Sequence, residues 1–209
     1  MSFSGNKDSN AWPKTSEVMA VPVQVDLASA DDIGLLFSKV KELGRLDLLV
    51  NNAGILEAQT NLLGLSLDRL QRVYTVNVFA PILCSQLAVP FLKQSGGGII
   101  NISSIAAKTG SANEYIDYAG SKGAIDSITV GMAKELAADG IRVNAVRPGM
   151  INTQIHADGG EPDRVNRLAS AIPLGRGGEP SEVAEVVEWL ASNRASYCTG
   201  SIIDVSGGL

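Results

Sequence analysis

Histidine and cysteine are scarce in this 209-residue chain, and their scarcity excludes whole classes of active site. His156 is the single histidine, so a mechanism that needs a histidine pair or cluster is not available. Cys84 and Cys198 are the two cysteines, and they lie far apart without the short spacing of metal ligands. We therefore expect no metal site and two reduced, packed thiols, as is usual in the cytoplasm.

Long basic and long apolar stretches are missing as well. The chain has 17 Lys and Arg residues against 22 Asp and Glu residues, a net charge of −5, whereas a nucleic-acid surface needs clustered basic side chains. Polar residues or prolines interrupt every apolar stretch, so no segment is expected to cross a membrane as a helix. The N-terminus lacks the basic start and apolar core of a secretory signal, which predicts a cytoplasmic protein without nucleic-acid or membrane partners.

The composition that remains is typical of one packed domain. Hydrophobic residues make up 45% of the chain and charged residues 19%, and the length suits a single core. From residue 20 onward, short β-rich runs alternate with longer helical runs. This alternation is typical of βαβ units, so we predict an α/β fold with a parallel sheet covered on both faces.

Residue types at the ends of these runs set the expected boundaries. Strands are predicted at residues 20–25, 46–54, 98–104, 141–149 and 201–208. Helices are predicted at residues 30–43 between the N-cap Ser29 and Gly44, at 66–93, at 114–140, and from the cap Ser181 to 191. Pro22 has no N–H, which places the first strand at a sheet edge. Pro81 predicts a kink in the second helix and Pro90 predicts its end.

Tyr118 and Lys122 are the strongest candidates for catalysis. They stand four residues apart on one predicted helix, so their side chains leave the same face. An ammonium beside a phenol favours the phenolate, which predicts a lowered pKa for Tyr118 and proton exchange near neutral pH. Ser104 ends the preceding strand, at the carboxyl edge where open α/β sheets hold their ligands, and its hydroxyl can hold a substrate carbonyl against Tyr118. Tyr115 lies seven residues from Lys122 and is interpreted as a substrate-side or packing residue.

Four motifs in order along the chain resemble those of the short-chain dehydrogenase/reductase family. They are LVNNAG at residues 49–54, NISS at 101–104, YAGSK at 118–122 and IRVNAVRPG at 141–149. The resemblance covers residues 20–209, and the chain looks most like bacterial sugar dehydrogenases and 3-oxoacyl-carrier-protein reductases. It implies a Rossmann-like doubly wound parallel sheet and an enzyme that uses NAD or NADP to move a hydride between nicotinamide and a carbonyl or secondary alcohol.

The functional residues of that family have matches here. Tyr118 matches the catalytic acid/base, and Lys122 matches the residue that lowers the tyrosine pKa and bonds the nicotinamide ribose. Ser104 matches the residue that orients the substrate oxygen, and Asn77 matches the asparagine that holds a water in a proton relay reaching Lys122. The positions that match cofactor contacts are Asp26, Asn52, Ala53, Gly54, Tyr118, Lys122, Pro148, Gly149, Ile151 and Thr153.

The same resemblance gives expectations for partners. The segment from Ser181 to Gly208 is similar to the part that builds a subunit interface in tetrameric members, so a homo-oligomer, a tetramer or a dimer, is expected. The alternative is a monomer in which this segment only covers the sheet. His156 falls where the family has its mobile substrate lid, and a solvated loop histidine is the expected role, with a substrate contact as the alternative. The substrate is expected to be a small carbonyl or alcohol.

The N-terminal region departs from the family pattern. The turn Thr-Gly-x-x-x-Gly-x-Gly, which receives the cofactor pyrophosphate, has no match in the sequence, and residues 20–25 correspond to the third strand of the family. We therefore expect residues 1–18 to be an atypical polar leader and residues 19–209 a single domain that lacks the first two strands. Three explanations stay open: a longer native chain, a sheet that closes up with residues 20–25 beside residues 46–51, or strands supplied by another segment or subunit.

The missing turn leaves two functions open. The first is the oxidoreductase described above, and the second is a catalytically silent subunit of the same fold with a structural or interaction role. The choice between NAD and NADP is not encoded in the matched motifs, because the residue that distinguishes a ribose 2′-hydroxyl from a 2′-phosphate follows the second strand. Titration of the protein with NADH and NADPH separates the two functions.

Overall fold

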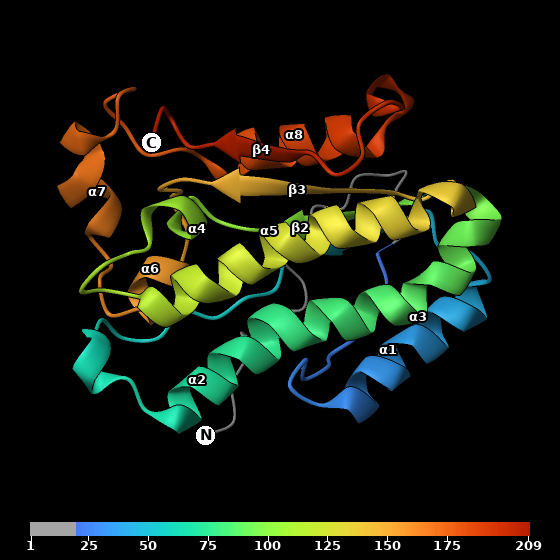
Figure 1. Cartoon of the computed structure of the whole chain (residues 1–209), viewed down its shortest axis with the longest axis horizontal. Coiled ribbons are helices and arrows are strands. Elements are labelled where there is room, and N and C mark those ends of the chain that lie inside the picture. Colours follow the sequence, from blue (N-terminus) through green and yellow to red (C-terminus); the bar gives the residue numbers. More distant parts are fainter. Residues whose placement is uncertain (1–19) are drawn as a thin grey trace.

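The computed structural model describes residues 20–209. The expected leader at residues 1–18 lies outside the described residues, so the division of the chain into leader and domain stays a prediction. A parallel sheet of four strands forms the centre, in the order β1-β2-β3-β4 (Figure 1). The strands are β1 (Leu48–Asn51), β2 (Gly98–Ile102), β3 (Arg142–Pro148) and β4 (Ile202–Val205). Every connection between them contains at least one helix, as parallel neighbours require.

Helices cover both faces of this sheet. They are α1 (Ala30–Leu43), α2 (Leu67–Tyr74), α3 (Ala80–Ser95), α4 (Ala106–Thr109), α5 (Ile116–Leu136), α6 (Ile155–Asp158), α7 (Arg164–Leu168) and α8 (Pro180–Ala191). A π-helical segment, Thr75–Phe79, joins α2 to α3. Helices α3 and α5 pack on one face with α1 against α3, and α8 packs on the other face (Figure 1).

Successive side chains of the strands enter different cores. Ile99 and Val143 are fully buried in the core shared with α1, α3 and α5. Ile100 and Val146 are equally buried in a second core, beneath Leu190 of α8. Because both faces are covered, apolar side chains are buried at successive positions of β2 and β3, and the buried Asn101 and Asn144 interrupt the apolar runs. The α/β class predicted from the alternation of elements is confirmed.

Helix α1 begins and ends where the sequence predicts. The Ser29 hydroxyl accepts a hydrogen bond from the Asp32 N–H at 3.2 Å, and Gly44 adopts a left-handed conformation with φ of 76° just after the last turn. The Asp32 carboxylate accepts from the N–H of Asp26 at 2.9 Å. The loop before α1 is therefore fastened to the first turn of the helix.

Residues 20–25 do not form the predicted strand. They carry no regular secondary structure, and among the described residues β1 pairs with β2 alone. A strand needs a neighbouring strand that forms hydrogen bonds with its N–H and C=O groups, and Pro22 has no N–H to donate. The suggestion that the sheet closes up, with residues 20–25 paired beside β1, is therefore wrong for the described structure.

Two predicted helix boundaries are also wrong. Glu179, not Ser181, caps α8, because Pro180 occupies the first turn and the Glu182 carboxylate accepts from the Glu179 N–H at 2.8 Å. Pro90 does not end α3, which continues to Ser95. Pro90 is exposed, so the carbonyl deprived of its N–H partner faces water.

The continuous helical stretch Leu67–Ser95 is long and apolar enough to cross a membrane by length and composition, contrary to the sequence-based expectation. In this fold the stretch is a core element: it packs against α1 on one side and α5 on the other. A buried core helix satisfies the same criteria of length and composition.

Both cysteines are free, as predicted. Cys84 is buried on α3 in the core beneath α1 and α5, and Cys198 is half-buried against the core under α8. Burial raises the pKa of the Cys84 thiol, which keeps this side chain protonated and unreactive at neutral pH.

Candidate active site

A cavity of about 730 Å³ lies at the carboxyl ends of β1, β2 and β3. The predicted site residues that line it are Asn52, Ala53, Gly54, Ser104, Tyr118, Lys122, Pro148, Gly149, Ile151 and Thr153. They come from the turn after β1, the end of β2, the first turns of α5 and the segment after β3. The sheet therefore brings four distant segments to the edge where α/β folds hold their ligands.

Lys122 is held in a fixed position between α5 and the sheet. Only 4% of the residue is exposed, and its Nζ donates a hydrogen bond to the Ile102 carbonyl at 2.7 Å. The Nζ also lies 5.7 Å from the centroid of the Tyr118 ring. Burial lowers the pKa of Lys122 to about 8, and the negative charge of Asp126 opposes this shift.

Tyr118 behaves differently from the sequence-based expectation. Burial raises the pKa of its phenol, and a hydrogen bond with Ser104 opposes that rise only in part. The predicted net lowering of the Tyr118 pKa is therefore wrong, because burial outweighs the contacts that favour the phenolate. The ammonium lies over the ring and binds the Ile102 carbonyl, so desolvation of the phenolate is the larger effect.

Ser104 is oriented by the start of α4. Its Oγ accepts a hydrogen bond from the Ala106 N–H at 3.1 Å, which leaves the hydroxyl proton available to the cavity. The neighbouring Ser103 hydroxyl donates to the backbone carbonyl of Lys122 at 3.2 Å. The end of β2 is thereby fastened to the turn of α5 that carries the lysine.

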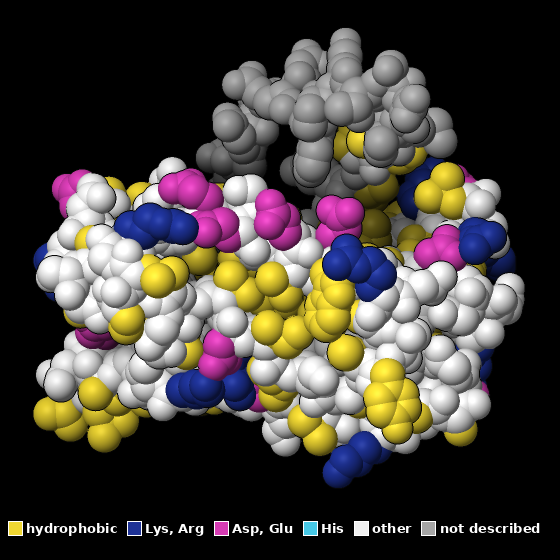
Figure 2. Space-filling model, turned by 90° about the horizontal axis from the view of Figure 1, so that it is seen from above, with side chains coloured by type: hydrophobic (Ala, Val, Ile, Leu, Met, Phe, Trp, Pro, Cys, Tyr) yellow, Lys and Arg dark blue, Asp and Glu magenta, His cyan; other side chains and the backbone are white. Residues whose placement is uncertain are grey.

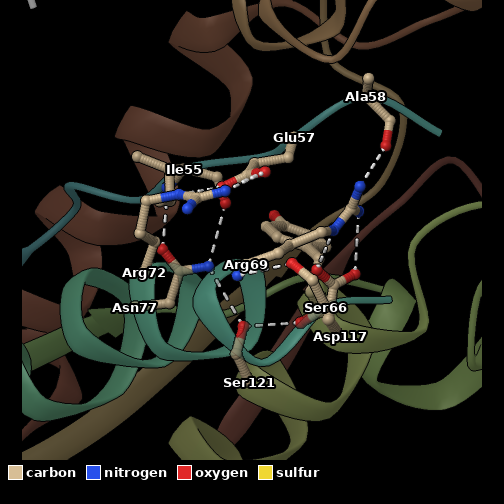
Figure 3. Close-up of polar contacts among 10 residues, drawn as sticks. Ile55, Glu57, Ala58, Ser66, Arg69, Arg72, Asn77, Asp117 and Ser121 are labelled. Carbon is tan, nitrogen blue, oxygen red and sulfur yellow. Dashed lines mark hydrogen bonds and ion pairs between the residues drawn. The ribbon is translucent and has the colours of Figure 1, made fainter. Parts of the chain in front are cut away.

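Asn77 occupies the middle of the π-helical segment and fixes the turn after β1 (Figure 3). Its Oδ1 accepts from the Ile55 N–H at 2.8 Å, while its Nδ2 donates to the Ile55 carbonyl at 3.0 Å and to the Ser121 hydroxyl at 3.1 Å. Ser121 in turn donates to the backbone carbonyl of Tyr118 at 2.7 Å. One side chain therefore connects the β1 turn, the opened helix and α5. The predicted relay role of Asn77 stays a prediction.

Each of the two turns predicted to contact the cofactor has a glycine, Gly54 or Gly149, where it passes close to another part of the protein. A Cβ on Gly54 would lie 3.3 Å from the Lys122 Nζ, and a Cβ on Gly149 would lie 2.7 Å from the Ser206 Cα. The Gly149 N–H donates to the Val205 carbonyl at 2.9 Å, which fastens the second turn to β4. Glycine is therefore required at position 149 because the backbone of the segment after β3 passes so close to the backbone at Ser206.

Asp26 is the predicted cofactor residue that the structure leaves out of the cavity. One of its carboxylate oxygens accepts from the Ala28 N–H at 2.9 Å, and its own N–H donates to the Asp32 carboxylate. These contacts belong to the loop that leads into α1. Its predicted contact with the cofactor stays a prediction.

His156 is buried, so the expectation of a solvated loop histidine is wrong. The residue is 8% exposed, lies on the short helix α6 and lines the cavity. Its Nε2 is 2.9 Å from the Ile151 carbonyl and must donate to it, which leaves Nδ1 as the unprotonated nitrogen. Nδ1 has no partner among residues 20–209, and burial lowers the pKa of the ring.

Arg164, the charged centre of another wall of the cavity, was not predicted from the sequence. The residue is 6% exposed, and its guanidinium binds the carboxylates of Glu114 and Glu161, with Nη1 at 3.2 Å and 2.9 Å from them. It also stacks 5.1 Å from the centroid of the Tyr115 ring. Tyr115 lines the cavity from its buried position and donates to the Gly159 carbonyl at 3.3 Å. The local pair of Glu161 and Arg164 gives no sign of a cavity wall, and the contact with Glu114 spans 50 positions, so it could not be predicted from spacing.

A second buried ion pair supports the start of α5. Arg69 on α2 binds Asp117 through Nε at 2.7 Å and Nη2 at 3.2 Å, and its Nη1 reaches the Ala58 carbonyl (Figure 3). Asp117 immediately precedes Tyr118 in the chain. The pair therefore fixes the helical turn that carries the phenol and leaves the Asp117 carboxylate engaged away from substrate.

Comparison with known proteins gives a consistent result. The family described as Enoyl-(Acyl carrier protein) reductase matches residues 4–209. The uncharacterized oxidoreductase YgfF of Escherichia coli strain K12 is 48% identical over 194 residues, which covers 90% of this chain and 78% of that protein. The 3-oxoacyl-(acyl-carrier-protein) reductase FabG of Thermotoga maritima is 40% identical over 190 residues, with coverages of 90% and 76%.

A solved structure shows the same architecture. The crystal structure of 3-ketoacyl-(acyl-carrier-protein) reductase from Brucella melitensis complexed with NADH superposes with a TM-score of 0.83 at 30% sequence identity. The superposition covers 89% of this chain and 77% of that one.

Proposed function

Because this chain belongs to the short-chain dehydrogenase/reductase family, we propose that it is an NAD(P)-dependent oxidoreductase that moves a hydride between nicotinamide and a carbonyl or secondary alcohol. The family resemblance and the Rossmann-like fold expected from the sequence motifs are confirmed by the matches. One observation carries the proposal: Ser104, Tyr118 and Lys122 meet in a single cavity together with the turns after β1 and β3.

The residues of the cavity suit the nicotinamide end of the cofactor. Lys122 uses one N–H on the Ile102 carbonyl, so two donors remain for ribose hydroxyls. The backbone at Gly54 and Gly149 lines the same cavity. Bound NADH or NADPH supplies the hydride, and the similar crystal structure was determined with NADH. We assign NAD or NADP as the cofactor without choosing between them.

The catalytic roles follow from the positions of three side chains. Ser104 donates a hydrogen bond from its hydroxyl to the substrate carbonyl oxygen and holds that oxygen next to Tyr118. As the carbonyl carbon gains the hydride, Tyr118 gives its phenolic proton to the oxygen, so an alcohol and a phenolate result. The Lys122 ammonium stabilises the phenolate, and we assign Asn77 to the relay that returns a proton. Alcohol oxidation runs through the same steps in reverse.

The pKa shifts favour carbonyl reduction at neutral pH. Because burial raises the pKa of Tyr118, the phenol holds the proton that reduction consumes. Because the pKa of Lys122 is about 8, most molecules carry the ammonium at pH 7. Reduction should therefore be fastest below pH 8 and decline above it.

Replacing Tyr118 tests the proposal. General acid catalysis contributes roughly 10²- to 10⁴-fold, so we expect Tyr118→Phe to lower kcat for carbonyl reduction by about that factor. Nucleotide affinity, followed by nicotinamide fluorescence with NADH and NADPH, should change little, and the circular dichroism spectrum should be unchanged. Full activity in the variant would refute the role of Tyr118. Failure of the unsubstituted protein to bind either nucleotide would refute the oxidoreductase proposal and favour the silent subunit.

The partners and location predicted from the sequence belong to this proposal. We assign a small carbonyl or alcohol as substrate, a cytoplasmic location, and a homo-oligomer that uses the segment from Ser181 to Gly208. Figure 2 views the side of the molecule on which α8 and β4 lie, and hydrophobic side chains gather in the middle of this face with charged side chains around them. This distribution supports contact between copies through that segment.

A further inference from the structure

Asp126 is a buried carboxylate that the proposed reaction has not used. It is 8% exposed and lies on α5, one helical turn after Lys122. Its Oδ2 accepts from Arg147, at 2.9 Å from Nε and 2.8 Å from Nη2. Its Oδ1 is buried and has no hydrogen-bond partner among the residues that the structure describes. A carboxylate oxygen in this position is costly unless a positive charge lies nearby.

Lys122 supplies that second positive charge. Side chains four residues apart on a helix lie on the same face, and both lean toward the N-terminus of the helix, so the carboxylate lies over the turn that carries the lysine. Within residues 20–209, the other groups beside the Lys122 Nζ carry no charge: β2 offers the Ile102 carbonyl, α5 offers the ring of Tyr118, and the turn after β1 offers Gly54. Asp126 is therefore the anion that faces Lys122.

An alternating row of charges holds Asp126 in place. Behind it, Arg147 of β3 also contacts Asp204 of β4, with Nη1 3.3 Å from Oδ1. Asp204 in turn pairs with Lys108 of α4. The row thus runs from the cavity to the surface across α5, β3, β4 and α4, and its signs alternate from Lys122 to Lys108. Arg147 fixes the Asp126 carboxylate through its Nε and Nη2.

We propose that Asp126 is a positioning residue for the reaction: its carboxylate, fixed by Arg147, is the counter-charge that keeps Lys122 an ammonium beside Tyr118. The inference rests on the proposed function, because the ammonium matters only where a phenolate has to be stabilised. Without Asp126, desolvation alone acts on Lys122. A neutral amine in that place does not stabilise the phenolate that proton donation leaves behind.

The sign of the pH effect follows from the lysine. Burial already lowers the pKa of Lys122 to about 8, and Asp126 raises it against that trend. The ammonium is lost as the pH rises through this pKa, so removing Asp126 moves the loss to lower pH. The effect should therefore appear on the alkaline limb of the pH profile.

The first test substitutes Asp126→Asn, which keeps the shape and removes the charge. We expect the alkaline limb of kcat for carbonyl reduction to move down by about one pH unit or more, which lowers kcat at pH 8 by roughly five- to tenfold. Asp126→Glu should return the alkaline limb of the kcat profile to the pH at which it lies in the unsubstituted protein. Asp204→Asn is the matched control, because it also removes a carboxylate from Arg147 but keeps the Asp126 carboxylate, and the alkaline limb of its pH profile should stay in place. An unmoved limb in Asp126→Asn would overturn the inference.

A second readout does not depend on activity. NMR titration of ¹³C-labelled lysine, with the Lys122 signal assigned through Lys122→Arg, should give a midpoint near 8 in the unsubstituted protein and a lower one in Asp126→Asn. If Asp126→Asn fails to fold because Arg147 loses its partner, the double variant D126L/R147M removes the pair together and should lower the same midpoint. An unchanged midpoint refutes the role of Asp126 even if the protein is an active reductase. A lowered midpoint in a protein without reductase activity refutes the proposed function alone.

Discussion

Gly54 lies where an added side chain would press on two residues of the site. A Cβ there would be 3.3 Å from the Lys122 Nζ and 3.4 Å from the Asn77 Oδ1, which is tighter than ordinary van der Waals contact. Both neighbours are held by other bonds, Lys122 to the Ile102 carbonyl and Asn77 to Ile55. A small displacement of the lysine is therefore the expected response to a methyl group.

We expect Gly54→Ala to fold and to lose about tenfold in kcat/KM, because small displacements of catalytic groups have large effects on rate. Gly123→Ala is the matched control on α5, since a Cβ there meets nothing within 4 Å. That substitution should raise the free energy of unfolding by about 0.5–1 kcal/mol and leave kcat/KM unchanged. Steady-state kinetics and thermal unfolding of the three proteins measure both effects. Equal kcat/KM in Gly54→Ala and the unsubstituted protein would contradict this account.

Some properties of single residues could be predicted from the sequence and others could not. That Tyr118 and Lys122 face the same way follows from local helix geometry, which a spacing of four reveals. The raised pKa of Tyr118 and the burial of His156 depend on packing by distant segments, which no spacing reports. Predictions about position were therefore better than predictions about environment.

The contact between α7 and the turn before α5 is the clearest functional feature among the elements. Arg164 of α7 holds Glu114 and Tyr115 on one side and Glu161 on the other, and Tyr115 reaches Gly159 beyond α6. The segment 155–168 is thereby fixed along the wall of the cavity opposite Lys122. We expect this ion-pair cluster to set how firmly the wall holds a substrate.

Replacing Arg164→Met keeps the apolar stem and removes the guanidinium. We expect KM for the carbonyl substrate to rise by roughly tenfold while nucleotide affinity changes little, because the wall that loses its ion pairs is the proposed substrate wall and not the cofactor turns. The free energy of unfolding should fall by about 1–2 kcal/mol, since the two carboxylates left behind stay partly exposed. Arg167→Met on the same helix removes an exposed partner of Glu161 and should have little effect on either quantity. A KM that rises equally in both variants would contradict the role of Arg164.

Elements with local signals were predicted best. Ser29 and Gly44 define the ends of α1 through contacts within a few residues, so the sequence alone placed this helix correctly. Residues 20–25 have the composition of a strand, but a strand exists only through its partner, and β1 does not pair with them. Pro90 does not end α3, although a proline usually ends a helix. Leu92 is buried in the core beyond it, and this tertiary packing keeps α3 helical.

For the molecule as a whole, the class of fold was predictable and the substrate side was not. Alternating elements and ordered motifs gave the parallel sheet and one wall of the cavity. The other wall forms when α6 and α7 fold back against the turn at Glu114, and Arg164 and Glu114 are 50 positions apart. Contacts at that separation depend on the path of the whole chain, so they could be found only in three dimensions.

His156 links the stability of the whole molecule to pH. The folded protein buries the neutral ring, with Nε2 donating to the Ile151 carbonyl, and desolvation lowers the pKa of the ring below its usual 6.5. In the unfolded chain His156 takes up a proton near its ordinary pKa. Below about pH 6.5 the unfolded chain therefore binds more protons than the folded protein, and the free energy of unfolding decreases as the pH is lowered. The loss should continue until the pH reaches the lowered pKa of the folded state.

We expect the midpoint of thermal unfolding to decrease between pH 7.5 and pH 5.5 and to decrease less in His156→Gln, whose amide retains a donor for the Ile151 carbonyl but does not titrate. Because the chain has one histidine, the difference between the two slopes isolates this residue from the carboxylates, which are the same in both proteins. Differential scanning calorimetry at closely spaced pH values measures the slopes. Parallel slopes would mean that the ring is protonated equally in both states, which would contradict its burial as a neutral group beside the cavity.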